Sequence, residues 1–320
     1  LVIGILGVIP HIMGELNLGI DFSGGRNYII RFAEPVNTQE VNAALDNVFM
    51  EAKSELADEE TFALNVITIG DANQVRVSTN YRINDNSETL DDEIEALLYE
   101  GCKQFLPENV TLKEFTSTDI NPEIGIMQSQ KVGPAIADDI TQSAVWAVLA
   151  ALLGIFLYVL LRFRNFSFSV GALAGLAHNT LIVLGAYALL WKVMPFSMEI
   201  DQSFIAAILT VIGYSINDTV VIFDRVREYT GLYPKRARKQ NINDALNQTL
   251  SRTFSTSMST LVVLIAIFCF GGETIRGFVC ALIIGVVVGT YSSLCVATPL
   301  AYDIQEALDR RKAKKAALNK

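Results

Sequence analysis

One acidic residue inside an apolar stretch is the feature of this sequence most able to do chemistry. Asp218 lies in the segment GYSINDTVVIFDRVRE (213–228), which begins in an apolar run and ends in charged residues. A carboxylate placed several residues inside a membrane-length helix is costly, so it is usually there to bind or move an ion. Asp218 is therefore our first candidate for a proton-transferring group.

Arg252 is the second candidate, because it opens the next predicted membrane helix within the hydroxyl-rich run TLSRTFSTSMST. Both residues fall in the same half of the membrane, so Arg252 could change the pKa of Asp218 as the helices move. A structural salt bridge between the helices is the alternative, and Arg252 could also extend its charge to the membrane surface. The supporting polar residues of this site are Ser215, Asn217, Thr219, His178 and Asn179.

The composition indicates a membrane protein with a separate hydrophilic part. Hydrophobic residues make up 51% of the chain and charged residues 18%, and the mean hydropathy is +0.35. Between Met13 and Lys131 there are 8 Lys and Arg against 22 Asp and Glu, so nucleic-acid binding is not expected. The four cysteines form no CxxC pattern or disulfide framework, and no metal site or cofactor is predicted.

Five apolar segments have the length needed to cross a bilayer. They are residues 140–161, 166–190, 203–223, 253–270 and 275–297. Residues 1–12 are also apolar, and we expect them to be the outer end of a first membrane helix that begins before Leu1. The sequence thus predicts a polytopic α-helical membrane protein with six transmembrane helices, the first of them truncated, and with a membrane domain at 138–300.

Basic residues gather in alternate loops of this membrane part. They lie between the second and third helices, between the fourth and fifth, and after the sixth, whereas the other loops contain little more than Lys192 and Arg276. The positive-inside rule places the basic loops and the basic tail 301–320 in the cytoplasm. The acidic region 13–137 is therefore expected to be extracytoplasmic.

The periodicity of region 13–137 predicts an α+β ferredoxin-like domain of order βαββαβ. Strands are expected at 27–32, 62–69, 74–79 and 110–115, and helices at 37–56 and 88–105. Asn37 and Glu40 have the spacing of a capping box, and residues 70–73 are typical of a hairpin turn. The carboxylates at 58–60 and 91–93 are expected to be solvated helix caps, so no catalytic site is predicted here.

Several segments resemble one known family in the correct order along the chain. They are LGIDFSGG (18–25), KVGP (131–134), GYSINDTVVIFDRVRE (213–228), TLSRTFSTSMSTL (249–261) and FGGETIRGFVCALIIGVVVGTYSS (270–293). These segments are similar to the SecF family of protein-export membrane subunits, within the resistance-nodulation-division superfamily. The resemblance implies a bacterial cytoplasmic-membrane protein that works with SecD, separate or fused upstream, beside the SecYEG channel.

The resemblance also implies an auxiliary translocase role, in which the proton gradient drives late, ATP-independent export of a preprotein and no enzymatic reaction occurs. By motif, Asp218 and Arg252 become the proton-path residues. Many family members have His-Asp where this chain has His178-Asn179, and an asparagine cannot titrate, so a proton role at Asn179 is doubtful. His178 has hydrogen-bonded packing as its alternative role.

Three alternatives stay open at this stage. A proton-driven exporter of small molecules or lipids would use the same carboxylate with a different cargo, and an assembly factor would use it only as a structural pair. Sodium could replace the proton, because a carboxylate with neighbouring amide and hydroxyl oxygens can hold either ion.

Overall fold

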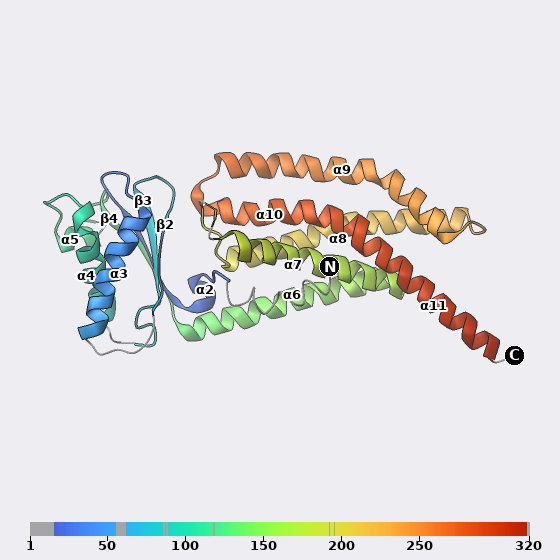
Figure 1. The fold of residues 1–320 in the computed structure, drawn as a ribbon, viewed down its shortest axis with the longest axis horizontal. Helices are drawn as coiled ribbons and strands as arrows, with labels where there is room; N and C mark the ends of the chain where they lie inside the picture. The colour runs from blue at the N-terminus through green and yellow to red at the C-terminus, as the bar shows by residue number, and fades with distance from the viewer. Residues whose placement is uncertain are drawn as a thin grey trace.

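The chain folds into a small sheet domain at one end of a bundle of long helices (Figure 1). The computed structural model describes residues 16–55, 62–85, 87, 89–117, 119–191, 193, 194 and 196–318. The predicted first membrane segment, 1–12, lies outside the described residues.

The sheet domain contains four antiparallel strands in the spatial order β2-β3-β1-β4. Its principal elements are β1 (Gly25–Arg31), α3 (Thr38–Glu55), β2 (Leu64–Thr68), β3 (Gln74–Thr79), α4 (Leu90–Cys102) and β4 (Gly125–Val132). Short helical turns lie before β1 and after α4, namely α2 (Ile20–Ser23), η1 (Lys103–Phe105) and α5 (Leu112–Thr116). Gly24 and Gly25, at the start of β1, have φ values of 69° and 148°, a left-handed backbone that other residues rarely adopt.

Hydrophobic alternation explains which face of this sheet is covered. Tyr28 and Ile30 of β1 and Val75 and Val77 of β3 are buried on one face, against α3 and α4. The intervening residues of β3, Gln74, Arg76 and Ser78, lie on the opposite face, because successive side chains of a strand point to opposite sides. Figure 1 shows that this second face is turned toward the helix bundle.

Most predicted elements of the sheet domain are confirmed, but the strand predicted at 110–115 is wrong. That segment forms the turn of helix α5, because Thr111 accepts a hydrogen bond from the Glu114 backbone N–H while the Glu114 carboxylate accepts one from the Thr111 N–H. This capping box favours a helix start over an extended strand. The fourth strand is β4, whose exposed stretch from Gln128 to Lys131 lacks the alternation that would have revealed it.

The Asn37–Glu40 spacing gives a helix cap of a different form. Asn37 accepts the backbone N–H of Gln39 at 2.9 Å, whereas the Glu40 carboxylate bonds the Asn37 side chain at 3.4 Å. Helix α3 therefore begins at the predicted place with a single side-chain cap on its backbone.

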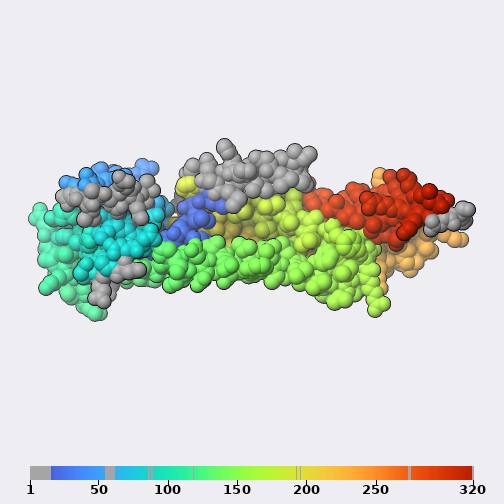
Figure 2. Space-filling model, turned by 90° about the horizontal axis from the view of Figure 1, so that it is seen from below, coloured from blue at the N-terminus to red at the C-terminus, as the bar shows by residue number. Residues whose placement is uncertain are grey.

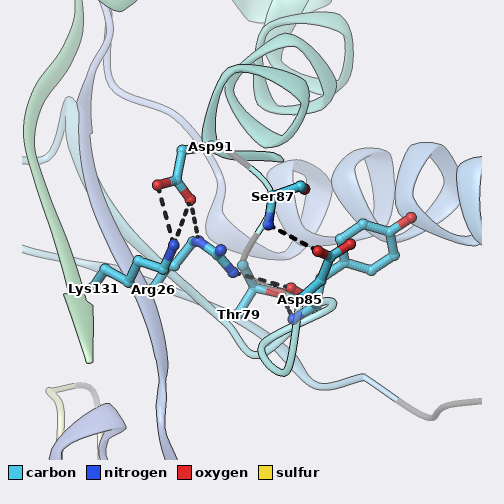
Figure 3. A network of polar contacts seen from close by, with 7 residues as sticks. Arg26, Thr79, Asp85, Ser87, Asp91 and Lys131 are labelled. Atoms are coloured by element: carbon cyan, nitrogen blue, oxygen red, sulfur yellow. Dashed lines mark hydrogen bonds and ion pairs between the residues drawn. The ribbon is translucent and has the colours of Figure 1, made fainter. Parts of the chain in front are cut away.

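A buried arginine joins the sheet to α4, as Figure 3 shows. Arg26 is 1% exposed; its Nε donates to Asp91 at 2.8 Å and its Nη1 to the Tyr81 carbonyl at 3.2 Å. Lys131 of β4 donates to the same carboxylate at 3.2 Å. Asp91 is thus a partner of a buried cation, which corrects the expectation that residues 91–93 are only solvated caps. Partial burial opposes the charged form of Asp91, but the bonds from Arg26 and Lys131 outweigh it and lower its pKa.

The helix bundle contains five helices, among the described residues, that are long and apolar enough to cross a membrane. Its elements are α6 (Pro134–Phe163), α7 (Phe166–Leu190), α8 (Gln202–Leu232), α9 (Arg238–Phe270), α10 (Glu273–Ser292), η2 (Ser293–Ala297) and α11 (Thr298–Leu318). The five predicted spans are confirmed as helices of this kind. Their ends differ, because α8 continues nine residues beyond 223 and α9 begins at Arg238 instead of 253. Polar residues extend both helices past the apolar stretches that the prediction relied on.

The last helix continues without a break from α10 into α11 through the π-helical segment η2. The Thr298 hydroxyl donates to the Ser293 carbonyl at 2.9 Å across this segment. Such π-helical insertions are rare and occur often at functional sites. The predicted basic tail, 301–320, is helical as far as Leu318.

The basic segments gather at the end of the bundle away from the sheet domain (Figure 1). There Arg162 of α6 pairs with Asp224 of α8 at 2.9 Å, and Arg238 of α9 pairs with Asp309 of α11 at 2.8 Å. Helix α6 runs along one side of the bundle, and its own outward-facing side is exposed along much of its length, as the space-filling view shows (Figure 2). The sheet domain and the basic segments therefore occupy opposite ends of the membrane helices.

Glycines allow α10 and α7 to approach their neighbours closely. A Cβ on Gly285 of α10 would lie 2.3 Å from the Val211 side chain of α8, and one on Gly171 of α7 would lie 2.6 Å from the Ala297 carbonyl. The glycine pairs Gly171–Gly175 and Gly285–Gly289, each with a spacing of four residues, therefore lie in helix contacts, as is typical of close packing in membranes.

Replacing Asp91 by asparagine is expected to destabilise the sheet domain by about 1–2 kcal/mol, because the buried Arg26 loses a charged acceptor that is itself half exposed. Hydrogen exchange of β1 and β4 in the full-length protein should then accelerate about tenfold. Asp92→Asn, one residue along at an exposed position, is the matched control and should change little.

The same ion pair predicts a pH dependence. The pKa of Asp91 in the folded protein lies below its ordinary value of 3.8. The ion pair therefore contributes fully to the free energy of unfolding above pH 3.8, and this contribution is lost as the pH falls through the folded pKa. Equal exchange rates in Asp91→Asn and the unmodified protein at pH 7 would contradict this account.

Gly285→Ala is expected to lower stability by about 1–3 kcal/mol, because the added methyl group overpacks the contact with Val211. Thermal unfolding in detergent should show a lower midpoint, and Val211→Ala in the same chain should restore part of the loss. Gly213→Ala is the control, since a Cβ there meets no atom within 4 Å and alanine favours a helix. Equal midpoints for the two alanine variants would refute the packing argument.

Candidate functional site

Helix α8 carries the acidic candidate on one polar face. Ser215, Asp218 and Thr219 are 3%, 5% and 3% exposed, and their spacing of three and four residues puts them on the same side of a helix. Asn217 is exposed, so it points away from this face. Asp218 lies near the middle of α8, because the helix extends to Leu232, whereas the sequence placed it about five residues from the end.

Helix α7 contributes an amide to this face. The Asn179 side chain, 1% exposed, donates from Nδ2 to the Ser215 Oγ at 2.8 Å. A Cβ on Gly289 of α10 would lie 2.1 Å from the Ser215 Oγ and 2.9 Å from the Asn179 Nδ2. Asn179 is therefore a hydrogen-bonding neighbour of the α8 polar face, and Gly289 leaves space for the bond.

The π-helical segment η2 contributes a hydroxyl. Ser293 and Thr219 share a hydrogen bond of 2.8 Å between their hydroxyls, and the Ser293 Oγ lies 3.3 Å from the Ser215 carbonyl. Both hydroxyl-bearing residues are buried. A change in the winding of η2 would therefore move a side chain that contacts the same turn of α8 as Asp218.

Helix α9 contributes a row of hydroxyls at intervals of four residues: Thr249, Thr253 and Ser257, all buried. The Ser257 hydroxyl interacts with the Asp218 carboxylate and shares a 2.6 Å hydrogen bond with Thr290 of α10. The carboxylate is thus linked through one serine to the neighbouring helix.

Several polar atoms of this cluster are buried with no hydrogen-bond partner. Among the described residues they include Asp218 Oδ2, Asn179 Oδ1, Thr253 Oγ1 and His178 Nδ1. A buried polar atom without a partner costs free energy, and in native proteins it often marks a functional site or a bound water or ion. The cluster can therefore accept a proton at Asp218, and its oxygen atoms can hydrogen-bond water or coordinate a small cation.

Arg252 lies inside α9 and does not begin it, which corrects the sequence expectation. It is exposed, and it interacts with Asp218 electrostatically, but within the described part of the chain no ion pair joins the two residues. The arrangement keeps a cation near the carboxylate without neutralising it directly.

His178 is half-buried on α7, and its ring centroid lies 6.3 Å from that of Tyr291 on α10. It adjoins Asn179 in sequence but occupies a different side of the helix, with less burial. In the described residues no group of three or more His, Cys, Asp or Glu side chains could hold a metal ion. The site is built from one carboxylate, one amide and several hydroxyls.

Sequence reasoning missed the contribution of α10 and η2. Thr290 and Ser293 belong to the segment GTYSS, which follows a long apolar run and led to no prediction of a polar site. Ser257 stood in a run noted only for its many hydroxyls. The four-residue spacing of Thr249, Thr253 and Ser257 was the available signal, since it places the three side chains on one helix face.

Comparison with known proteins assigns the chain to a family. Residues 112–307 match the profile of the family described as protein export membrane protein SecD/SecF, C-terminal, and residues 15–36 match the SecD/SecF GG motif. The protein translocase subunit SecF of Rhodothermus marinus is 38% identical over 302 residues, covering 94% of this chain and 87% of the relative. The corresponding subunit of Thermodesulfovibrio yellowstonii is 35% identical, with the same two coverages.

A solved structure supports the same assignment. The crystal structure of SecDF, described as a translocon-associated membrane protein from Thermus thermophilus, matches 94% of this chain with a TM-score of 0.71 at 31% identity. This chain spans 36% of the length of that SecDF chain. The resemblance found in the sequence motifs is therefore confirmed, and the chain belongs to the SecF family of protein translocase subunits.

Proposed function

We propose that this protein is an auxiliary subunit of the Sec translocase that uses the proton-motive force to drive late, ATP-independent steps of polypeptide export. The observation that supports this most is the Asp218 carboxylate, which is buried near the middle of α8 with Oδ2 unbonded. Hydrogen bonds to a carboxylate stabilise its charged form, so a carboxylate with an unbonded oxygen is less stabilised in that form and takes up a proton more readily. The names of the relatives supply the translocase context.

In the proposed mechanism Asp218 takes a proton from the outer side and releases it toward the cytoplasm. Neutralising the carboxylate weakens its attraction to Arg252 and its bond from Ser257, so α8 and α9 change their packing. One charge crossing about 100 mV releases about 2.3 kcal/mol, so several protons are needed to release a firmly held polypeptide. No chemical bond is made or broken in this cycle except those to protons.

The proposed setting is a bacterial cytoplasmic membrane crossed six times, with residues 1–12 as part of the first span. The basic end of the bundle supports a cytoplasmic position for that end, and the sheet domain then lies outside. The strand order β2-β3-β1-β4 with two helices on one face supports a ferredoxin-like arrangement of that domain. The proposed partners are SecD, the SecYEG channel, the exported preprotein and membrane lipid.

Asp218→Asn is expected to abolish export driven by a proton gradient, because an amide cannot take up the proton. The measurement uses inverted membrane vesicles with a preprotein stalled part-way across and without ATP. Completion of export after imposing the gradient is compared at equal membrane abundance. Asp224→Asn is the matched control, since this carboxylate is on the same helix but is more than a third exposed and paired with Arg162.

Equal responses of the unmodified protein and Asp218→Asn would contradict the role of Asp218. Absence of any response in the unmodified protein would contradict the export function and favour the exporter. Lower abundance of Asp218→Asn, with normal activity per molecule, would favour an assembly factor. Repeating the assay with and without sodium separates proton from sodium coupling.

A further inference from the structure

An ion pair joins the sheet domain to the helix bundle. The Arg76 Nη2 of β3 lies 2.8 Å from the Glu199 Oε2 in the loop between α7 and α8, and it also donates to the Ser197 hydroxyl at 3.1 Å. The side chains of Arg76 and Glu199 are 18% and 8% exposed. Removing one of two charges that are so little exposed costs free energy, because the remaining charge stays buried without a partner.

The position of Arg76 explains why it reaches the bundle. Its neighbours Val75 and Val77 are buried in the core beneath α3 and α4, so Arg76 projects from the other face of the sheet. That face is turned toward the bundle in Figure 1. The guanidinium therefore spans the interval between the two parts of the molecule.

The partner of Arg76 is attached almost directly to the start of α8. Glu199 precedes Gln202, the first residue of α8, by three positions, and Asp201 caps the helix by accepting the Phe204 N–H at 2.8 Å. The Gln202 N–H lies 3.2 Å from the Asp21 carboxylate. These bonds make the beginning of α8 continuous with the segment that holds Glu199.

The same loop is held to the chain that leads into the sheet. The Ile200 N–H donates to the Asn17 carbonyl at 2.8 Å, and the Gly19 N–H donates to the Ile200 carbonyl at 3.0 Å. On its other side the loop lies against α10, where a Cβ on Gly277 would be 2.5 Å from the Ser197 carbonyl. These contacts hold the loop in a fixed position, so a displacement of α8 can be transmitted through it to the sheet.

Electrostatics favour a cation at this position. Burial is the main influence on Glu199 and raises its pKa, and Arg76 opposes that rise. Asp201 and Asp21 add further negative charge near the pair. Arg76 thus offsets the repulsion among the carboxylates of Glu199, Asp201 and Asp21, which would otherwise disfavour this arrangement of the loop.

We propose that Arg76 and Glu199 are positioning residues that transmit movement of α8 to the sheet domain. Sixteen residues separate Gln202 from Asp218, about 24 Å along a rigid helix, so repacking at Asp218 displaces Glu199 and, through it, β3. The polypeptide chain that leaves the sheet at β4 continues into α6 and not into α8. This direct connection therefore does not by itself transmit a movement of α8 to the sheet. This inference rests on the proposed function, and it identifies the contact that links the Asp218 site to the sheet domain.

The test compares export with protonation of Asp218 in the full-length protein. Glu199→Gln and Arg76→Gln are introduced singly, and Arg31→Gln is the control, since Arg31 lies on the same sheet face and contacts Gln74 within the sheet. Labelling by a hydrophobic carbodiimide, above the background of Asp218→Asn, reports protonated Asp218. Gradient-driven export in vesicles at equal abundance reports the coupled movement.

We expect Glu199→Gln and Arg76→Gln to slow export about tenfold, a usual size for coupling between two sites, while labelling of Asp218 keeps its response to the gradient. Arg76→Lys, which retains the charge, should recover part of the rate. Normal export by Glu199→Gln would overturn the link and leave the proposed function intact. Labelling and export that fall together in both glutamine variants would also overturn it, whereas export unaffected by Asp218→Asn would refute the proposed function itself.

Discussion

The structure depends on keeping one carboxylate inside a packed helix bundle. Removing the Asp218 carboxylate from water costs several kcal/mol unless its oxygens find partners, and one of them finds none among the described residues. The Ser257 hydroxyl of α9 interacts with the carboxylate and is linked to Thr290 of α10, while Ser293 of η2 bonds to the neighbouring Thr219. The bundle therefore holds a buried carboxylate with one unpaired oxygen, and this is the feature on which the proposed proton coupling rests.

Close helix packing is the condition for this arrangement. Gly289 leaves space where Ser215 and Asn179 meet, and Gly285 admits the Val211 side chain. Without such contacts the hydroxyls would be too far from α8 to hydrogen-bond it. The π-helical segment η2 brings Ser293 against α8, where it shares a hydrogen bond with Thr219.

One set of interactions holds the sheet domain together internally, and another ties it to the helix bundle. Its interior is held by hydrophobic burial and by the Arg26–Asp91 pair, which involve only the sheet and its helices. Its contact with the bundle includes the Arg76–Glu199 pair at the start of α8. A domain that is firm internally and tied at a charged contact can move as a unit, which suits a part proposed to act on a polypeptide outside the membrane.

The sequence by itself determined the five apolar helices, most of the sheet domain and the presence of a carboxylate, Asp218, inside a membrane-length helix, because length, periodicity and a charge within an apolar run are local signals. It could not determine β4, whose exposed residues lack alternation, nor Arg76–Glu199, whose partners are 123 positions apart. It also left open an ion pair between Arg252 and Asp218, which the described residues do not contain. Only tertiary packing decides which hydroxyls from separate helices meet, since that depends on helix rotation and on the glycines that set their spacing.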